Sequence, residues 1–126
     1  MIPDWNASDY LISAREYSVF MKALFNASYL SIKDSEYCTE LLCKSDCNEG
    51  LKSGVPQNCE IAHKFGEAGT GGNLQLSESG IIYCKDKPYI LTVMTNGKDF
   101  KKLPQVISDI SKLINENINQ IPTVKA

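Results

Sequence analysis

The hydrophobic pattern of the chain changes its period at Pro56-Gln57-Asn58, and this change constrains the fold more than any other feature. Before it, apolar residues recur every three or four positions, which is the spacing of amphipathic helices. After it, runs at about 59–67, 74–84 and 89–96 are extended and bounded by turn residues, as strands are. A last apolar stripe, Leu103 to Ile121, returns to helical spacing. The pattern therefore predicts an α+β fold, with helices first, then strands, then one amphipathic helix.

Two capping boxes predict where the first helices begin. Ser13-Ala14-Arg15-Glu16 and Ser31-Ile32-Lys33-Asp34 both place an acidic residue three positions after a serine, so that each serine hydroxyl can accept from a free backbone N–H. The helices should end near Asn26 and Lys44. The first helix should turn one apolar face to the core: Ala14, Tyr17, Phe20, Met21 and Leu24.

Short links join the three strands, so they should form an antiparallel meander. The third run, Tyr89 to Thr95, is apolar almost throughout, which is typical of a central strand. Only one neighbouring strand is evident for it, so we expect an open edge prone to self-association or to pairing with another chain. The closing helix should either begin near Leu103, with Pro104 at its first position, or be kinked there.

Length and charge limit the function classes. The 126 residues fit one domain, with a helical part at about 1–56 and the sheet plus terminal helix at about 59–121. Thirteen basic and fifteen acidic residues give a net charge of -2, so nucleic acid is not an expected partner. No run approaches the roughly 18 apolar residues of a membrane span, and no basic-then-apolar leader opens the chain. We expect neither a membrane span nor an export signal in this sequence.

The five cysteines include no Cys-x-x-Cys pair of the kind that structural zinc sites use. Cys43 and Cys47 could share a helix face and His63 could join them, but cysteine also behaves as a small core hydrophobe, so we expect buried thiols and no metal. The odd count argues against a disulfide framework. The glycine run Gly66 to Gly72 precedes a strand and lacks a following Gly-Lys-Ser/Thr, so it predicts a hairpin turn rather than a phosphate loop. We expect no cofactor.

The residues with most chemical potential stand on the first strand. His63 and Lys64 precede Gly66, and a strand lysine beside a glycine can hold an anion. Taken alone, the same pattern also fits a surface lysine and a packed or solvated histidine. The residue pattern leaves both interpretations open.

Several segments carry a family resemblance in a fixed order along the chain: Ile12–Tyr17, Leu42–Asp46 ahead of Gly50-Leu51, Ala62-His63-Lys64-Phe65-Gly66, Ser79–Tyr83, Pro88–Leu91 and Val93–Phe100. From about Tyr10 to Ile114 this succession resembles the C-terminal half of class A beta-lactamase-like serine hydrolases, the broad family of serine beta-lactamases and penicillin-binding proteins. The resemblance implies part of a beta-lactamase/transpeptidase-like fold. Relatives in that family are usually exported.

The resemblance also implies roles on the first strand. Lys64 would be the family's strand lysine, supplying positive charge to a substrate carboxylate and to the site's proton network. Gly66 would leave room for the acylated substrate. The backbone N–H of Glu67 would be one donor of an oxyanion hole. His63 and Phe65 would contact substrate from the same strand, although Phe65 stands where many members carry a hydroxyl residue.

The family's nucleophile lies in a Ser-x-x-Lys motif, and no serine of this chain is followed three residues later by lysine. The chain is thus expected to be the C-terminal portion of a hydrolase that opens beta-lactams through an acyl-enzyme, and to be inactive alone. Its expected partners are the missing N-terminal half and a beta-lactam or peptidoglycan-like small molecule. Two alternatives remain open: a penicillin-binding carboxypeptidase or transpeptidase, and a non-catalytic module that binds a partner through the open sheet edge.

Overall fold

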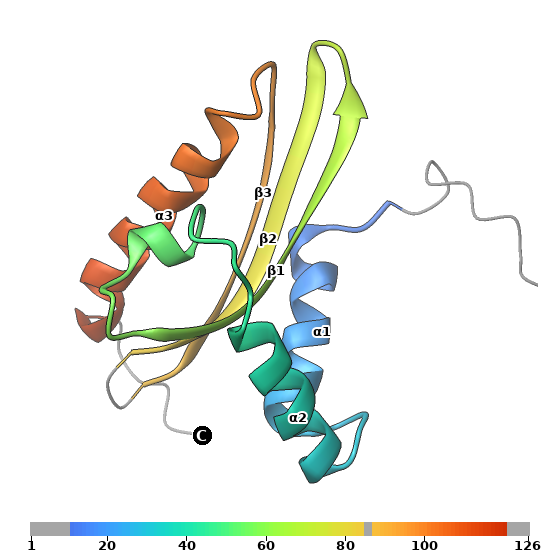
Figure 1. Ribbon diagram of the computed structural model, residues 1–126, viewed down its shortest axis with the longest axis vertical. Coiled ribbons are helices and arrows are strands. Elements are labelled where there is room, and N and C mark those ends of the chain that lie inside the picture. The colour runs from blue at the N-terminus through green and yellow to red at the C-terminus, as the bar shows by residue number, and fades with distance from the viewer. Residues whose placement is uncertain (1–10, 85–86, 121–126) are drawn as a thin grey trace, which may run out of the picture.

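The computed structural model describes residues 11–84 and 87–120, and it places the sheet between helices (Figure 1). In chain order the elements are α1 (Ala14–Asn26), α2 (Ile32–Cys43), the 3-10 turn η2 (Lys52–Gly54), β1 (Glu60–Thr70), β2 (Asn73–Tyr83), β3 (Tyr89–Gly97), α3 (Leu103–Asn117) and the 3-10 turn η3 (Ile118–Gln120). The α+β class and the order of elements are confirmed. The predicted outer limits at residues 1 and 121 lie outside the described residues.

Both serine caps form as the sequence predicts. Ser13 Oγ accepts from the Glu16 N–H at 3.1 Å, and the Glu16 carboxylate accepts from the Ser13 N–H at 3.3 Å, so the capping box is complete. Ser31 Oγ accepts from the Asp34 N–H at 3.1 Å. Pro104 lies in the first turn of α3, where its missing N–H has no helical partner to lose.

The sheet has the order β1-β2-β3, with both pairs antiparallel. The turn between β1 and β2 is shorter than predicted, because β1 stays paired as far as Thr70, opposite Asn73, and only Gly71-Gly72 connect them. Gly71 takes φ 63, a conformation that favours glycine. Within the described residues no strand pairs with the outer edge of β3, as the single evident neighbour led us to expect.

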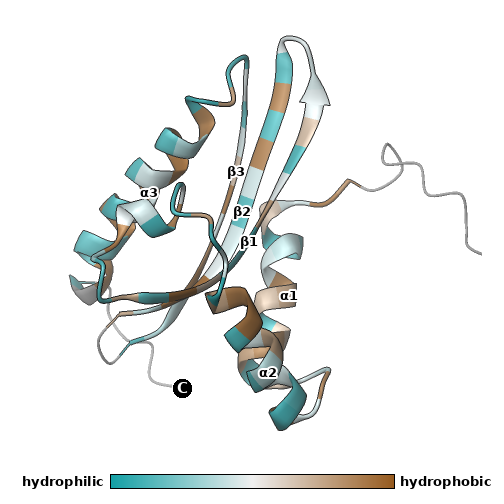
Figure 2. Ribbon diagram, in the orientation of Figure 1, coloured by the Kyte–Doolittle hydropathy of each residue, from teal (hydrophilic) through white to brown (hydrophobic). Residues whose placement is uncertain are grey.

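Two layers cover the sheet. On one face α3 and the 50–54 loop bury Leu51, Leu76, Val93, Leu103 and Ile107. On the other face α1 and α2 pack over a smaller cluster built on Met21, Ala62 and Ile81. Alternating brown and teal bands at the hairpin end of β2 in Figure 2 show the period-2 pattern that separates the faces there.

The predicted core face of α1 is only partly correct. Met21 is buried and Ala14, Tyr17 and Leu24 are half-buried, whereas Phe20 is 66% exposed. α1 contacts the sheet through one narrow side, and Phe20 lies beyond the reach of that contact. Apolar spacing alone could not separate the packed side from its neighbour.

The expectation that the cysteines stay thiols is wrong for two of them, because Cys59 and Cys84 form a disulfide. They directly flank the Glu60–Tyr83 pair of the ladder, which brings their Cα atoms to 4.7 Å. Cys38, Cys43 and Cys47 are free and half-buried. Across residues 11–84 and 87–120, no three His, Cys, Asp or Glu side chains gather in a way that could hold a metal ion. The helices described there are also too short or too polar to cross a membrane.

Candidate functional site

The His63-Lys64 pair is divided between the two faces of the sheet, because successive side chains of a strand point to opposite sides. Lys64 is exposed on the face covered by α1 and α2, which it shares with Gly66. His63 is only 2% exposed and lies on the face that packs against the 50–54 loop and α3. The structure therefore does not bring the His63 ring to the surface that carries Lys64.

A hollow of about 380 Å³ lies beside Gly66, between the start of α1 and the β1–β2 hairpin. Its walls mix apolar side chains of α1 and its lead-in with small and polar positions of the strands: Leu11, Ile12, Tyr17, Gly66, Glu67, Ala68, Gln75, Ser77 and Met94. The exposed Lys64 ammonium donates to the Phe65 carbonyl at 2.6 Å and lies 5.1 Å from the Phe65 ring centroid. The hollow contains two of the predicted residues, Gly66 and Glu67.

Phe65 points to the other face of β1. With Glu67 it borders a smaller depression of about 80 Å³, beside Cys47, Gly50 and Glu78. Of the five predicted residues, Lys64, Gly66 and the Glu67 backbone thus lie together along one stretch of strand. The side chains of His63 and Phe65 face away from it.

Tyr17 is a site residue that sequence reasoning assigned only to the core. Its hydroxyl donates to the Lys64 carbonyl at 3.1 Å and its side chain lines the hollow. Burial, and secondarily the negative charge of Glu78, raise the pKa of Tyr17, so the phenol remains a donor well into the alkaline range. The sequence signal for this contact is a tyrosine hydroxyl on the apolar face of a predicted helix, where it needs a hydrogen-bond partner.

A buried ion-pairing contact lies directly behind the Lys64 stretch. His63 Nδ1 and Glu78 Oε1 are 2.7 Å apart, and each residue is 2% exposed. The second carboxylate oxygen, Glu78 Oε2, accepts from the Leu51 N–H at 3.0 Å. Glu78 lies on the same core-facing side of β2 as Leu76 and Gly80, and a buried carboxylate at such a position requires a partner. The strand pattern alone indicates that Glu78 needs a partner, and the register of β1 and β2 identifies that partner as His63.

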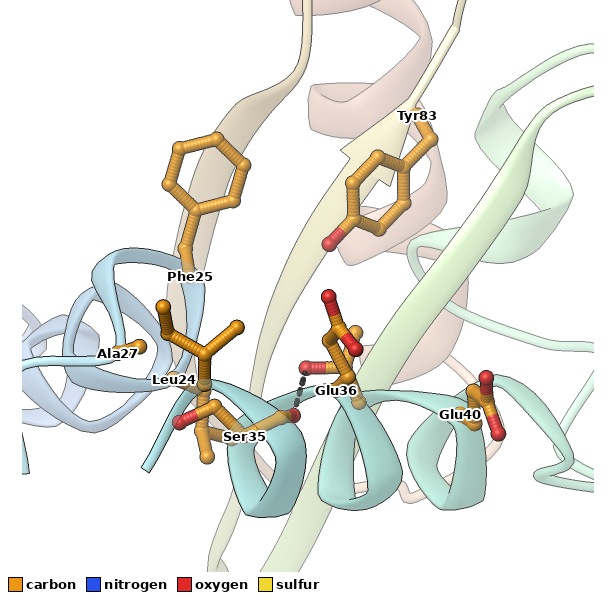
Figure 3. Close-up of a pocket in the computed structure, with 9 residues that line it drawn as sticks. Leu24, Phe25, Ala27, Ser35, Glu36, Glu40 and Tyr83 are labelled. Atoms are coloured by element: carbon orange, nitrogen blue, oxygen red, sulfur yellow. Dashed lines mark hydrogen bonds between the residues drawn. The ribbon is translucent and has the colours of Figure 1, made fainter. Parts of the chain in front are cut away.

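A second hollow, of about 320 Å³, lies where α1 and α2 meet the end of β2 (Figure 3). Phe25 and Tyr83 face each other across it, and the Tyr83 hydroxyl points toward the Glu36 side chain (Figure 3). Burial raises the pKa of Tyr83. The hollow holds acidic and apolar groups but none of the predicted site residues, so we assign it no function.

The fold matches solved structures of PBP-A and of beta-lactamases. PBP-A matches with a TM-score of 0.72 and 16% identity over 85% of this chain. A beta-lactamase from Xanthomonas campestris matches with a TM-score of 0.71 and 17% identity over 81% of this chain. A mutant of the class A beta-lactamase of the last common ancestor of Gram-negative bacteria matches with a TM-score of 0.70 and 18% identity over 84% of this chain. The architecture is therefore that of part of the class A beta-lactamase fold.

The chain covers 40%, 39% and 40% of these three solved chains. A model of the Beta-lactamase enzyme family matches residues 2–118, and the chain belongs to this family. A search of curated proteins found no match.

Proposed function

We propose that this chain forms the substrate-holding wall of a beta-lactamase-like serine hydrolase. Lys64 meets the substrate carboxylate, Gly66 leaves room for the ligand, and the Glu67 N–H donates to the developing oxyanion. The observation that carries the proposal is the open hollow beside Gly66, next to an exposed lysine in a chain of this family. A second PBP-A structure, an acyl-enzyme complex with penicillin G, makes a beta-lactam the first ligand to test.

The surroundings of Gly66 support a ligand-related reason for glycine there. Gly66 lacks the positive φ found at Gly50, Gly69 and Gly71, and a Cβ built on it would meet no atom within 4 Å. Neither backbone conformation nor packing requires glycine at this position. A strand glycine without a structural reason is typical of a place where a ligand approaches the backbone.

The strand register supports the assignment of the Glu67 N–H. Thr70 and Asn73 flank a two-residue turn, so they form the hydrogen-bonded pair that closes the hairpin. Bonded and non-bonded pairs alternate along an antiparallel ladder, which makes Glu67–Leu76 a non-bonded pair. The Glu67 N–H is therefore expected to point away from β2, toward the free edge of β1. An oxyanion-hole donor typically contributes about 3 kcal/mol to transition-state stabilisation.

The attacking group must come from outside these 126 residues, because they contain no Ser-x-x-Lys motif. Acyl transfer needs the nucleophile, its base and the oxyanion donors together. We infer that the chain binds substrate without turning it over. In the complete hydrolase its wall would serve beta-lactam hydrolysis or the related reactions of peptidoglycan carboxypeptidases and transpeptidases.

Equilibrium dialysis with benzylpenicillin tests the binding half of this proposal. The chain should bind the ligand reversibly, Lys64→Met should abolish binding, and Lys112→Met, which changes an exposed lysine on α3, should not. Equal binding by the Lys64→Met and Lys112→Met variants would contradict the assignment of Lys64.

Labelling with a fluorescent penicillin tests the other half. We expect no covalent label on the chain and no nitrocefin hydrolysis. A stable label that survives denaturation would show that these residues contain a nucleophile after all.

A second candidate function uses the edge of β3. The segment Tyr89 to Gly97 has no charged residue and no proline, and these are two of the devices by which proteins protect exposed edges. A non-catalytic module could bind an extended peptide there by adding a strand. If the edge of β3 is the binding surface, Thr92→Pro should abolish partner binding. If the hollow beside Gly66 is the binding site, the same variant should still bind benzylpenicillin.

A further inference from the structure

The buried pair His63–Glu78 is built into the strand that carries Lys64, and the proposed binding function does not use it. His63 is opposite Gly80 in the ladder, whereas Glu78 is opposite Phe65, so their 2.7 Å contact runs diagonally between β1 and β2. It spans the stretch of β1 from which Lys64 projects on the other face. A side-chain tie at this place restrains the strand behind the site.

Two glycines make the space that the pair occupies. A Cβ at Gly80 would lie 3.1 Å from His63 Cβ, tighter than ordinary packing, so glycine there admits the histidine. Gly50 has φ 66, and a Cβ built on it would collide with the Glu78 carboxylate. The pair therefore fills space that a side chain at Gly50 or Gly80 would need, and glycine at both positions accommodates it.

The carboxylate also connects the strand to the rest of the fold. Glu78 accepts from the Leu51 N–H at 3.0 Å, and the Leu51 carbonyl in turn accepts from Ser111 Oγ at 2.8 Å. Leu51 and Ser111 are fully buried. A continuous set of hydrogen bonds thus runs from α3 through the 50–54 loop to His63.

With Glu78 ionised, the bonding pattern assigns a proton to Nδ1 of His63. An ionised carboxylate has only acceptor positions, and it already accepts from Leu51. The contact with His63 therefore needs a donor on the ring, which is Nδ1–H in either the neutral or the protonated imidazole.

We propose that His63 and Glu78 are positioning residues for Lys64 and the Glu67 amide: the buried pair sets the course of β1 so that both groups address one ligand. This inference rests on the proposed binding function. It gives His63 a part in the site that its location on the opposite face would not otherwise allow.

NMR of the full ¹⁵N-labelled chain tests the proposal. Wild type should show a protonated Nδ1 at His63. His63→Asn places an amide N–H where Nδ1–H was, so the amide shifts of residues 64–67 should be kept and the Kd for benzylpenicillin should stay within about twofold. His63→Leu should shift those amides and weaken binding at least about fivefold for the same folded fraction. Ile82→Ala, which truncates a buried side chain of β2 that makes no hydrogen bond to the pair, is the control for general destabilisation.

Each outcome bears on a separate claim. Unchanged amides and affinity in His63→Leu, or an equal loss in Ile82→Ala, would overturn the positioning role. If wild type binds no benzylpenicillin but the amide shifts respond as expected, the proposed function fails and the positioning role stands.

Should His63→Leu not fold, Glu78→Gln provides the test. Its amide oxygen must serve the Leu51 N–H, so its amide N–H must face His63, and the Nδ1 proton should be lost while residues 64–67 stay in place. Retention of the Nδ1 proton in this variant would overturn the bonding scheme.

Discussion

The two faces of the sheet differ in how completely they are filled. The face toward α3 buries Ile107 and Leu51 completely and holds the buried carboxylate of Glu78 in hydrogen bonds to His63 and Leu51. The face toward α1 and α2 leaves Met94 37% exposed and is hollow beside Gly66. Neighbouring residues of β1 therefore have different tasks. His63 is held by buried contacts, while the Lys64 side chain is exposed and, in the proposed function, meets the ligand.

This difference explains why stability and binding should separate by face. Buried groups on the α3 face lose packing or leave a charge without a partner when they are changed. Outside the cluster of Met21, Ala62 and Ile81, exposed groups beside Gly66 on the other face have little packing to lose, so changes there should act on ligands.

His63→Leu should lower the free energy of unfolding by about 3–5 kcal/mol, because it leaves the Glu78 carboxylate buried without its partner. Urea denaturation measures the loss. The double variant with Glu78→Leu should recover part of it, since an apolar pair carries no buried charge. If wild type and His63→Leu were equally stable, the claim that the α3 face is the one on which stability depends would be contradicted.

Ile107→Ala and Met94→Ala form a matched pair across the sheet. The first truncates a side chain with no exposed surface and should cost about 2–5 kcal/mol. The second, at a half-open position, should cost less than about 1 kcal/mol. Comparable thermal shifts for the two variants would mean that the open face is packed as tightly as the closed one.

Tyr17→Phe should cost up to about 1 kcal/mol at neutral pH, through loss of the hydrogen bond to the Lys64 carbonyl. Because burial raises the pKa of Tyr17 in the fold, its contribution is fully present below the unfolded pKa near 10 and is lost as pH rises through the higher folded value. The variant should therefore lose less stability than wild type above about pH 10. Urea denaturation at a series of alkaline pH values measures this. If the free energy of unfolding fell equally steeply with pH in wild type and Tyr17→Phe, the prediction would be contradicted.

Gly66→Ala should leave stability unchanged or raise it by about 0.5 kcal/mol, since the added methyl group meets no atom and the strand loses a glycine. It should nonetheless weaken ligand binding. Gly50→Ala is the contrasting variant, and it should be destabilised by both its φ of 66 and the collision with Glu78. A marked loss of stability in Gly66→Ala would mean that this glycine is structural.

Local signals predicted most of the fold. The Ser13 and Ser31 caps and the position of Pro104 depend on short-range chemistry, and all three helices begin where these residues predict. The outward side of Phe20 and the Cys59–Cys84 disulfide depend on which surfaces meet in three dimensions, and apolar spacing and a cysteine count do not contain that information.

The candidate site was predictable to the level of its strand. Lys64, Gly66 and Glu67 follow from one short segment and its resemblance to the family. The separation of His63 from them follows from simple alternation, which the role carried over from the family overlooked. The Glu78 partner and the Tyr17 contact needed the register of β2 and the placement of α1, which are long-range results of folding.

A map of backbone amide shifts during titration with benzylpenicillin tests whether the strand that carries Lys64 and Gly66 holds the ligand. We expect saturable, reversible shifts that cluster at residues 64–68 and 75–77 and vanish in Lys64→Met. Shifts centred instead on the hollow at Phe25 and Tyr83, or along the free edge of β3, would contradict it.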